Sequence, residues 1–495
     1  MTLTSASVRV VLLEQKERTR RCSKAEIERI IQESKLEIIS LDSKIDALVG
    51  RDSQLSEAQI SSLIGLHDSQ RACVLALKYI ASPIYGLPVE LLVEIFEHAI
   101  EDETHIRDVY RITQVCSDWR EIAHRTPRLW TRLLKIGLCT EQSGEGLKAW
   151  LSRSAPLPLR ICFIRQRHDF RDVNRGTWEE ALKAAPRFHA FKFYSASETP
   201  SAAGLGNALP IPYESTMPVF TAPRLRKLTL KHVGAPVQVV VPWTQLTELT
   251  LRCNWPEATF EVLSRCANLI TASITFRGFE WSLPAAKHNL PIRFRQLHAL
   301  TLCLKSDTHP LDHLSTPVLQ KLQLALESQR FTVAHLTEFQ LRAPNITSLE
   351  ITKPSALTST NLITIVRHAP SLTHLKLTQC DNCFNDNLIR ALHYYDDVPP
   401  LAPCLHDLFV CNDRVMDFDE EVLAGMLASR WWSDTEFAAD PVLPPVTRWT
   451  RVELQFELGF FLRHHFGTRF TDIVKDIPSH VLIHSKEPVR EYVYF

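Results

Sequence analysis

The sequence lacks an excess of either charge, because its 56 lysines and arginines are balanced by 56 aspartates and glutamates. This balance gives no overall electrostatic footprint for nucleic acid or for an anionic membrane surface. No run of about eighteen apolar residues occurs, so no membrane-spanning segment is predicted. Val8 to Leu13 is apolar but too short and wrongly flanked for a secretory signal. We therefore expect neither a nucleic-acid partner nor a membrane partner.

Glycine is also scarce, with 14 residues against 29 prolines, and neither GxxxxGK[ST] nor GxGxxG occurs. Gly-rich loops that cradle phosphate groups are therefore not a theme of this chain. The twelve cysteines are scattered at irregular intervals and indicate no disulfide framework. Such usage is typical of reduced thiols, so we expect a location in the cytoplasm, the nucleus or both.

No set of residues reaches the pattern of an active site. Cys380 and Cys383 have the spacing of a zinc-ligand pair, but a second pair at a regular offset is missing. His464 and His465 are not accompanied by a nucleophile motif such as GxSxG. We expect no catalytic residue, no cofactor and no metal. A hydrolase or a metal enzyme is the alternative from the class of enzymes.

The sequence is rich in helical periodicity near its start. Residues 1–22 contain a short basic cluster and are predicted to be a solvated, disordered stub. Residues 23–81 carry apolar positions at alternating steps of four and three, which is the seam of a coiled coil. These positions are Ile27, Ile31, Ser34, Ile38, Leu41, Ile45 and Leu48. The break at residues 50–53 favours an antiparallel helical hairpin, and a longer intermolecular coiled coil is the alternative.

Residues 82–135 form the most informative stretch. Pro88 suits the first turn of a helix, where its missing N–H would have no partner. The apolar residues that follow share one broad helix face, because they are three or four residues apart. They are Leu91, Leu92, Ile95, Phe96 and Ala99. A second amphipathic segment, ended by Pro127, carries Val109, Ile112, Cys116 and Trp119. Periodicity alone predicts a helical hairpin that buries its own faces.

Three pieces of this stretch, in this order, resemble an F-box. They are Leu87-Pro88-Val89-Glu90-Leu91-Leu92 with Ile95-Phe96, then Val115-Cys116-Ser117-Asp118-Trp119, then Pro127-Arg128-Leu129-Trp130. The resemblance implies a substrate receptor that binds a Skp-type adaptor and, through it, a cullin. The residues implied for this F-box are Leu87, Pro88, Leu91, Leu92, Ile95, Phe96, Val115, Cys116, Trp119, Leu129 and Trp130. Their division between hairpin core and adaptor face is left open by the sequence.

Residues 150–460 contain a recurring unit of the form L-x-x-L-x-L. Clear copies begin at Leu225, Leu246, Leu297, Leu319, Ile346, Leu372 and Leu405, and weaker copies begin at Phe188, Leu269 and Trp449. From Leu225 to Leu405, successive starts are 21 to 33 residues apart, with room for a helix between strands. A strand and a helix that repeat cannot bury their apolar face alone, so the units are expected to stack into an α/β solenoid.

These units resemble leucine-rich repeats, and residues 461–495 are predicted to be a C-terminal cap and tail. The family usually places Asn or Cys three residues after the strand's last Leu, where it bonds the turn backbone. Asn254 and Cys380 occupy that position, whereas Val233, Lys305 and most others do not. We therefore expect irregular repeats with uneven curvature. The layout of helical hairpin, F-box and irregular repeats resembles the large F-box families of mushroom-type fungi.

The combined resemblance implies a substrate-recognition subunit of a Skp–cullin–F-box ubiquitin ligase without catalytic residues of its own. A protein-interaction scaffold outside any ligase is the alternative. In L-x-x-L-x-L the neighbours of the last two apolar residues point away from the core. Such neighbours give a possible face for a protein target, namely Lys227, Lys231, Glu248, Arg252, Lys321, Glu350, Lys376 and Phe409. Their charges alternate in sign, which argues against a polyanionic ligand. A solvated face without a ligand is the alternative.

Overall fold

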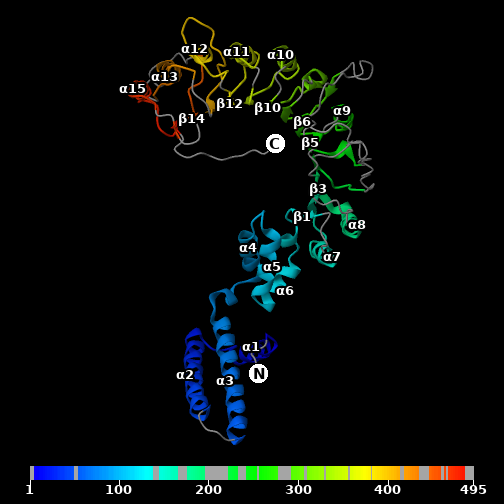
Figure 1. Ribbon diagram of the computed structural model, residues 1–495, viewed down its shortest axis with the longest axis vertical. Coiled ribbons are helices and arrows are strands. Elements are labelled where there is room, and N and C mark those ends of the chain that lie inside the picture. The colour runs from blue at the N-terminus through cyan, green and yellow to red at the C-terminus, as the bar shows by residue number, and fades with distance from the viewer. Residues whose placement is uncertain are drawn as a thin grey trace, which may run out of the picture. The chain divides into compact units, whose positions relative to one another are not determined.

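The computed structural model describes residues 5–49, 54–137, 144–165, 175–195, 221–231, 241–253, 256–276, 291–305, 309–327, 331–354, 357–380, 382–412, 417–433, 445–458, 462–463 and 466–484. The chain divides into two compact units, Met1–Leu129 and Trp130–Phe495 (Figure 1). The division falls inside the expected 82–135 domain, so Trp130 belongs to the second unit.

The first unit begins with α2 (Lys24–Val49) and α3 (Gln54–Ala81), which pack against each other within one chain (Figure 1). Their shared core contains Ile27 and Ile31 from α2 and Val74 and Leu77 from α3. The two α2 residues are four apart and therefore lie on one helix face. Residues 50–53, where the break between the helices was predicted, lie outside the described residues.

The expectation of a disordered stub at residues 1–22 was wrong, because most of this segment forms helix α1 (Ser5–Arg18), which packs on α3. The apolar residues between Val8 and Leu13 are nearly consecutive and therefore give no helical periodicity to read. Packing instead orders the helix near its end, where Gln15 and Thr19 are buried. The hydroxyl of Thr19 donates to the carbonyl of Gln15 at 2.6 Å.

Residues 83–130 form three α-helices where periodicity predicted two. They are α4 (Val89–Ala99), α5 (His105–Val115) and α6 (Ser117–Arg125), flanked by 3-10 turns η1 (Pro83–Gly86) and η2 (Pro127–Trp130). The predicted second helix breaks at Cys116, whose backbone is extended (φ −156°, ψ 174°). The Cys116 thiol accepts a hydrogen bond from the Trp119 backbone N–H at 3.4 Å. Capping of α6 therefore replaces continuation of α5.

The second unit is built on one large sheet. Its parallel strands are β1 (Leu134–Gly137), β2 (Leu159–Arg165), β3 (Phe188–Ser195), β4 (Lys227–Lys231), β5 (Glu248–Cys253), β6 (Thr271–Phe276), β8 (Ala299–Leu304), β10 (Lys321–Leu326), β11 (Ser348–Thr352), β12 (His374–Thr378), β13 (Asp407–Asn412) and β14 (Arg451–Leu458). Neighbours in the sheet follow chain order. At the far end β15 (Leu462–Arg463) pairs antiparallel and β16 (Leu482–His484) parallel with β14.

The last two apolar residues of each of the ten sequence triads lie in strands β3–β6, β8 and β10–β14. Equivalent residues are in register, so that Leu228 is opposite Leu249 and Leu375 opposite Leu408. A ladder of backbone hydrogen bonds precedes strands β5, β6, β8 and β10 to β14. The N–H groups of Thr247 and Glu248 both donate to the Arg226 carbonyl, at 2.8 and 3.0 Å. The same pair of bonds recurs up to β14, and it fixes each strand to one register.

Helices follow most of the strands and lie along the other side of the curved row that the strands form (Figure 1). They are α7 (Gly144–Arg153), α8 (Arg175–Lys183), α9 (Pro256–Arg265), α10 (Val333–Leu341), α11 (Ser359–Arg367), α12 (Asp386–Leu392), α13 (Glu420–Ser429) and α15 (Thr468–Ile473). Elsewhere 3-10 turns η3 (Ala185–Arg187), η5 (Trp243–Gln245) and η6 (Pro310–His313) and the short pair β7 (Ile292–Arg293) and β9 (Leu314–Ser315) connect the strands. The unit is α/β.

The sheet extends beyond the range in which repeats were predicted. β1 lies before residue 150, and β2 alternates as Leu159, Ile161 and Phe163 without the triad spacing. A four-residue strand and a plain alternation carry no repeat signal, so both strands were missed. At the other end, β16 lies inside the predicted cap and tail and joins the sheet beside β14. The last eleven residues, 485–495, lie outside the described residues.

Arginine and cysteine side chains tie successive repeats together. Arg187 donates to the carbonyls of Leu157 and Leu151, at 3.0 and 2.9 Å. Arg342 donates in the same way to Leu314 and Leu311. The thiol of Cys380, at the family's turn position, contacts the Ile351 carbonyl at 3.5 Å, whereas Asn254 lies outside the described residues.

Candidate functional site

The helices α4 to α6 bury some of their apolar side chains and expose others. Leu91 and Ile95 of α4 are 45% and 43% exposed, and Val89 is more exposed still. One residue further along α4, Leu92 and Phe96 are almost fully buried. Residues three and four apart on a helix share a face, so Leu91 and Ile95 form one apolar stripe. This stripe is a candidate interaction surface.

The structure thus divides the predicted F-box residues into groups that the sequence left mixed. Exposed residues are Pro88, Leu91, Ile95 and Val115. Half-buried residues are Leu87, Cys116 and Trp119. Buried residues are Leu92, Phe96, Leu129 and Trp130. In the first unit the Phe96 and Trp119 rings pack 4.7 Å apart. Sequence reasoning did not include Val89 in the site, although it is exposed at the first position of α4.

Trp130 has a different environment from the rest of this group. Its side chain is fully buried in the second unit, where its ring lies 4.7 Å from that of Trp150. The Trp150 indole N–H donates to the Trp130 carbonyl at 2.9 Å, and the Arg153 guanidinium lies over the Trp130 ring. Trp130 therefore acts in the core that starts the sheet and offers no exposed surface for a partner.

The long helix α3 is tied to the start of α6 by polar contacts. The hydroxyl of Tyr79 lies 3.3 Å from both the Cys116 thiol and a carboxylate oxygen of Asp118. Burial raises the pKa of Tyr79, and its hydrogen bond to Cys116 raises it further. The phenol is therefore neutral at physiological pH and can donate to Asp118. Tyr79 also packs edge-on against Tyr85 of η1, with ring centroids 5.2 Å apart.

Residues 84–135 match the family model described as F-box-like. This region is an F-box-like domain. The match covers most of η1, the helices α4 to α6 and η2, and it ends within β1. A comparison with curated proteins found no match for the chain.

The eight residues predicted as a target face all lie on the strands of the second unit, away from the F-box-like domain in sequence. They alternate with buried leucines, as the pattern Lys227, Leu228, Thr229, Leu230 shows. We call the surface formed by the outward residues of β1–β14 the open face. On it Lys227 pairs with Glu248 of the next strand at 2.6 Å. Arg252 is half-buried and Lys321 exposed.

Further along the open face, Lys376 makes two contacts with neighbouring strands. Its ammonium group lies 3.0 Å from the Glu350 carboxylate and 5.2 Å from the centroid of the Phe409 ring. Glu350 and Phe409 occupy the register positions on either side of Lys376. The structure therefore brings these three predicted residues together, and Phe409 is half-buried beneath the lysine chain.

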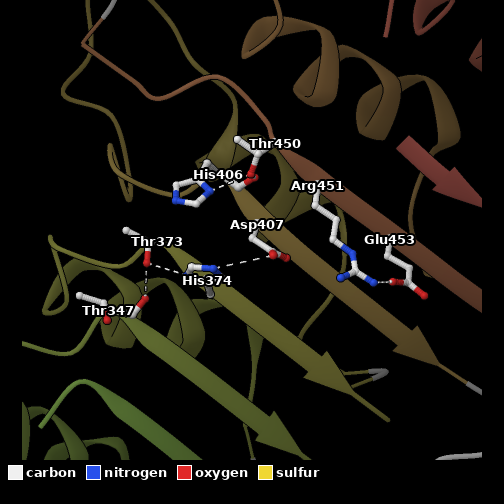
Figure 2. Close-up of polar contacts among 8 residues, drawn as sticks. All are labelled: Thr347, Thr373, His374, His406, Asp407, Thr450, Arg451 and Glu453. Atoms are coloured by element: carbon white, nitrogen blue, oxygen red, sulfur yellow. Dashed lines mark hydrogen bonds and ion pairs between the residues drawn. The ribbon is translucent and has the colours of Figure 1, made fainter. Parts of the chain in front are cut away.

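Polar groups at the start of β12 to β14 form a second network (Figure 2). His374 lies 3.8 Å from the Asp407 carboxylate, and the Arg451 guanidinium is 2.6 Å from Glu453. His406 contacts the Thr450 hydroxyl at 2.9 Å. Burial and the nearby His374 lower the pKa of His406. Arg451 and Glu453 were not predicted for this face, although the weak copy beginning at Trp449 points both residues outward.

The cysteine pair considered for zinc has other partners. The Cys383 thiol donates to the Leu357 carbonyl at 3.0 Å, and both Cys380 and Cys383 are buried. Within the described ranges, no three His, Cys, Asp or Glu side chains gather closely enough to hold a metal ion. His464 and His465 lie outside those ranges. None of the helices in the described part of the chain combines the length and apolar character that a membrane span requires.

Proposed function

We propose that this chain is the substrate-recognition subunit of a Skp–cullin–F-box E3 ubiquitin ligase. The observation that carries the proposal is the F-box-like domain, whose α4 exposes an apolar stripe. Leu91, Ile95 and Val89 would bind a Skp-type adaptor, because the removal of exposed apolar area from water favours association. Val115, at the end of α5, extends the exposed set. The adaptor would link the chain to a cullin.

The second unit would hold the protein target. We infer that its strands and helices form an irregular leucine-rich-repeat solenoid, and the repeated register and hydrogen-bond ladder support this inference. The open face presents polar and charged side chains along the row of strands. The combination of this face with an F-box-like domain also supports an assignment to the large F-box families of mushroom-type fungi, with a cytoplasmic or nuclear location.

The mechanism of such a subunit is positioning. Binding one partner at the F-box-like domain and another on the sheet raises their effective concentration toward each other. A target lysine is then held within reach of the ubiquitin-conjugating enzyme that the rest of the complex supplies. This role requires two binding surfaces on the chain, and it requires neither a proton-transfer group nor a nucleophile.

Adaptor binding tests the proposal directly. The double variant Leu91→Asp and Ile95→Asp should lose co-purification of a Skp-type adaptor, because two charges would be buried unpaired at the interface. Both side chains are exposed, so the melting temperature should stay within the range of ordinary surface variants. The matched control is Leu36→Asp on α2, an exposed leucine outside the F-box-like domain. Equal adaptor recovery for the double variant and the control contradicts the proposal and favours the non-ligase scaffold.

A further inference from the structure

Charge is distributed unevenly along the open face, which the sequence reading of alternating signs did not detect. The basic residues at outward positions of β1–β5 are Lys135, Arg160, Lys192, Lys227, Lys231 and Arg252. Glu248 is the one acidic residue at the described outward positions of these strands, and Lys227 pairs with it at 2.6 Å. Three of the basic residues, Lys135, Arg160 and Lys192, lie on β1, β2 and β3. The sequence predicted no target-face residue on these strands.

The remaining strands differ from this basic end. On β6 and β8 the outward residues are small or hydroxylated, as Ser273 and Thr301 show at matching register positions. On β11 to β14 both signs occur and are paired, as in Lys376 with Glu350 and Arg451 with Glu453. The basic end is therefore bounded by the uncharged stretch of β6 and β8. Beyond it, β10 carries the single exposed lysine Lys321, and the charges of β11 to β14 are paired.

Three of the four lysines at the basic end have no counter-charge from the described part of the chain. No acidic side chain of the described residues lies within ion-pair distance of Lys135, Lys192 or Lys231. Lys135 and Lys192 are in register with Cys162, which lies between them on β2. Burial raises the pKa of Cys162 to about 11, so its thiol is neutral at physiological pH and supplies no negative charge.

Lys231 lies in a partly desolvated environment close to other cations. Its side chain is half-buried, and its ammonium group lies 5.4 Å from the centroid of the Tyr194 ring. Burial lowers the pKa of Lys231, and the charge of Lys192 lowers it further. Half-buried cations that repel each other are stabilised by an anion bound between them.

We propose that β1–β5 of the open face bind an acidic segment of the protein target. The inference rests on the proposed function, in which the open face holds the target. Adjacent strands are about 4.8 Å apart, so β1 to β5 span roughly 19 Å. An extended segment covers that span with about six residues at roughly 3.3 Å each. A nucleic acid fits less well, because a basic path for a polyanion would continue along the sheet, whereas this one stops at β6.

Fluorescence anisotropy with the full-length protein tests this inference. The probe is a labelled peptide of about twelve residues that alternates Glu and Ser, at an ionic strength of about 0.05 M where screening is weak. The reference probes are the same peptide with Gln in place of Glu and an oligo-dT of similar length. The variants are Lys192→Gln with Lys231→Gln, and, at exposed positions that spare the fold, Lys135→Gln with Arg160→Gln. The matched control is Lys321→Gln, an exposed lysine of the open face on β10.

The wild-type protein should bind the Glu peptide and not the Gln peptide. Each double variant should weaken binding about tenfold, while Lys321→Gln leaves it unchanged. Failure of the wild-type protein to bind the Glu peptide, or wild-type affinity for that peptide in both double variants, overturns the inference. Tighter binding of oligo-dT than of the Glu peptide overturns it in favour of a nucleic acid. The adaptor has no part in this assay, so the outcome is independent of whether the F-box-like domain binds one.

Discussion

Replacement of Arg430 by Met should destabilise the second unit more than replacement of any exposed arginine. Arg430 follows α13, is fully buried, and donates to three backbone carbonyls. Its Nε, Nη1 and Nη2 atoms lie 3.0, 3.0 and 2.5 Å from the carbonyl oxygens of Leu392, Ala402 and Leu401. The guanidinium also lies over the Trp449 ring. One side chain thus holds both ends of the connection between α12 and the next strand.

The magnitude follows from the groups left behind. Each carbonyl that loses its partner costs about 1–3 kcal/mol, and Leu392 and Ala402 are buried where water does not replace the donor. Burial also lowers the pKa of Arg430 to about 10, because removing the charged guanidinium from water costs free energy. Met carries no charge and avoids this desolvation cost. The net loss in unfolding free energy should be about 3–5 kcal/mol. For a unit of this size that loss lowers the melting temperature by about 4–7 °C.

Thermal and urea unfolding monitored by circular dichroism measure the effect. Arg367→Met, at the exposed end of α11, is the control and should change the unfolding free energy by less than about 0.5 kcal/mol. Arg430→Lys should be at least as harmful as Arg430→Met, because it keeps a buried charge and loses the three-way fork. If Arg430→Met melts together with the control, the carbonyls find other donors and the reasoning is refuted.

Two further predictions concern titratable groups in the same unit. Burial and the charge of Arg430 lower the pKa of His393, so the unfolded chain binds more protons near pH 6.5. Stability should therefore fall as the pH drops from 7 to about 5.5, and His393→Gln should flatten this slope in melting experiments; an unchanged slope would exclude His393 as the cause. Burial raises the pKa of the Cys266 thiol to about 12, whereas Cys404 is exposed. Iodoacetamide at pH 8 should label Cys404 faster than Cys266, as followed by mass spectrometry, and equal rates would contradict the burial of Cys266.

The strands of the sheet were predictable because burial imposes a strict spacing on them. Leu225, Leu228 and Leu230 all enter one core, and the same demand repeats along the chain. The limits of prediction have equally physical causes. The thiol of Cys116 ends one helix and caps the next, which periodicity cannot register. Trp130 matched a motif, yet its buried partners come from Trp150 and Arg153, which follow in the chain.

The candidate site was predictable in outline and not in detail. The position of the F-box-like domain could be predicted from the motif between Leu87 and Trp130. Which of Leu91 and Leu92 is exposed depends on how the helix packs, and the sequence did not show it. On the sheet, the residues that point outward could be predicted from the alternation of side chains along a strand, wherever the sequence contained an L-x-x-L-x-L triad. Lys135 and Lys192 escaped because β1 carries no triad and β3 a weak one, so the excess of positive charge could not be seen.

The hydrogen-bond ladder before β5 and the later parallel strands has a consequence for how such a chain can vary. In each step of the ladder, the backbone N–H groups of two consecutive residues donate to one carbonyl of the preceding repeat. Thr247 donates to Arg226 in this way, and His406 donates to Thr373. The first step bridges 21 residues of sequence and the second 33, yet the bonding is the same. Insertions between repeats therefore leave the sheet geometry untouched. Related chains can lengthen their connections and diversify what surrounds the open face while the spacing of its side chains stays constant.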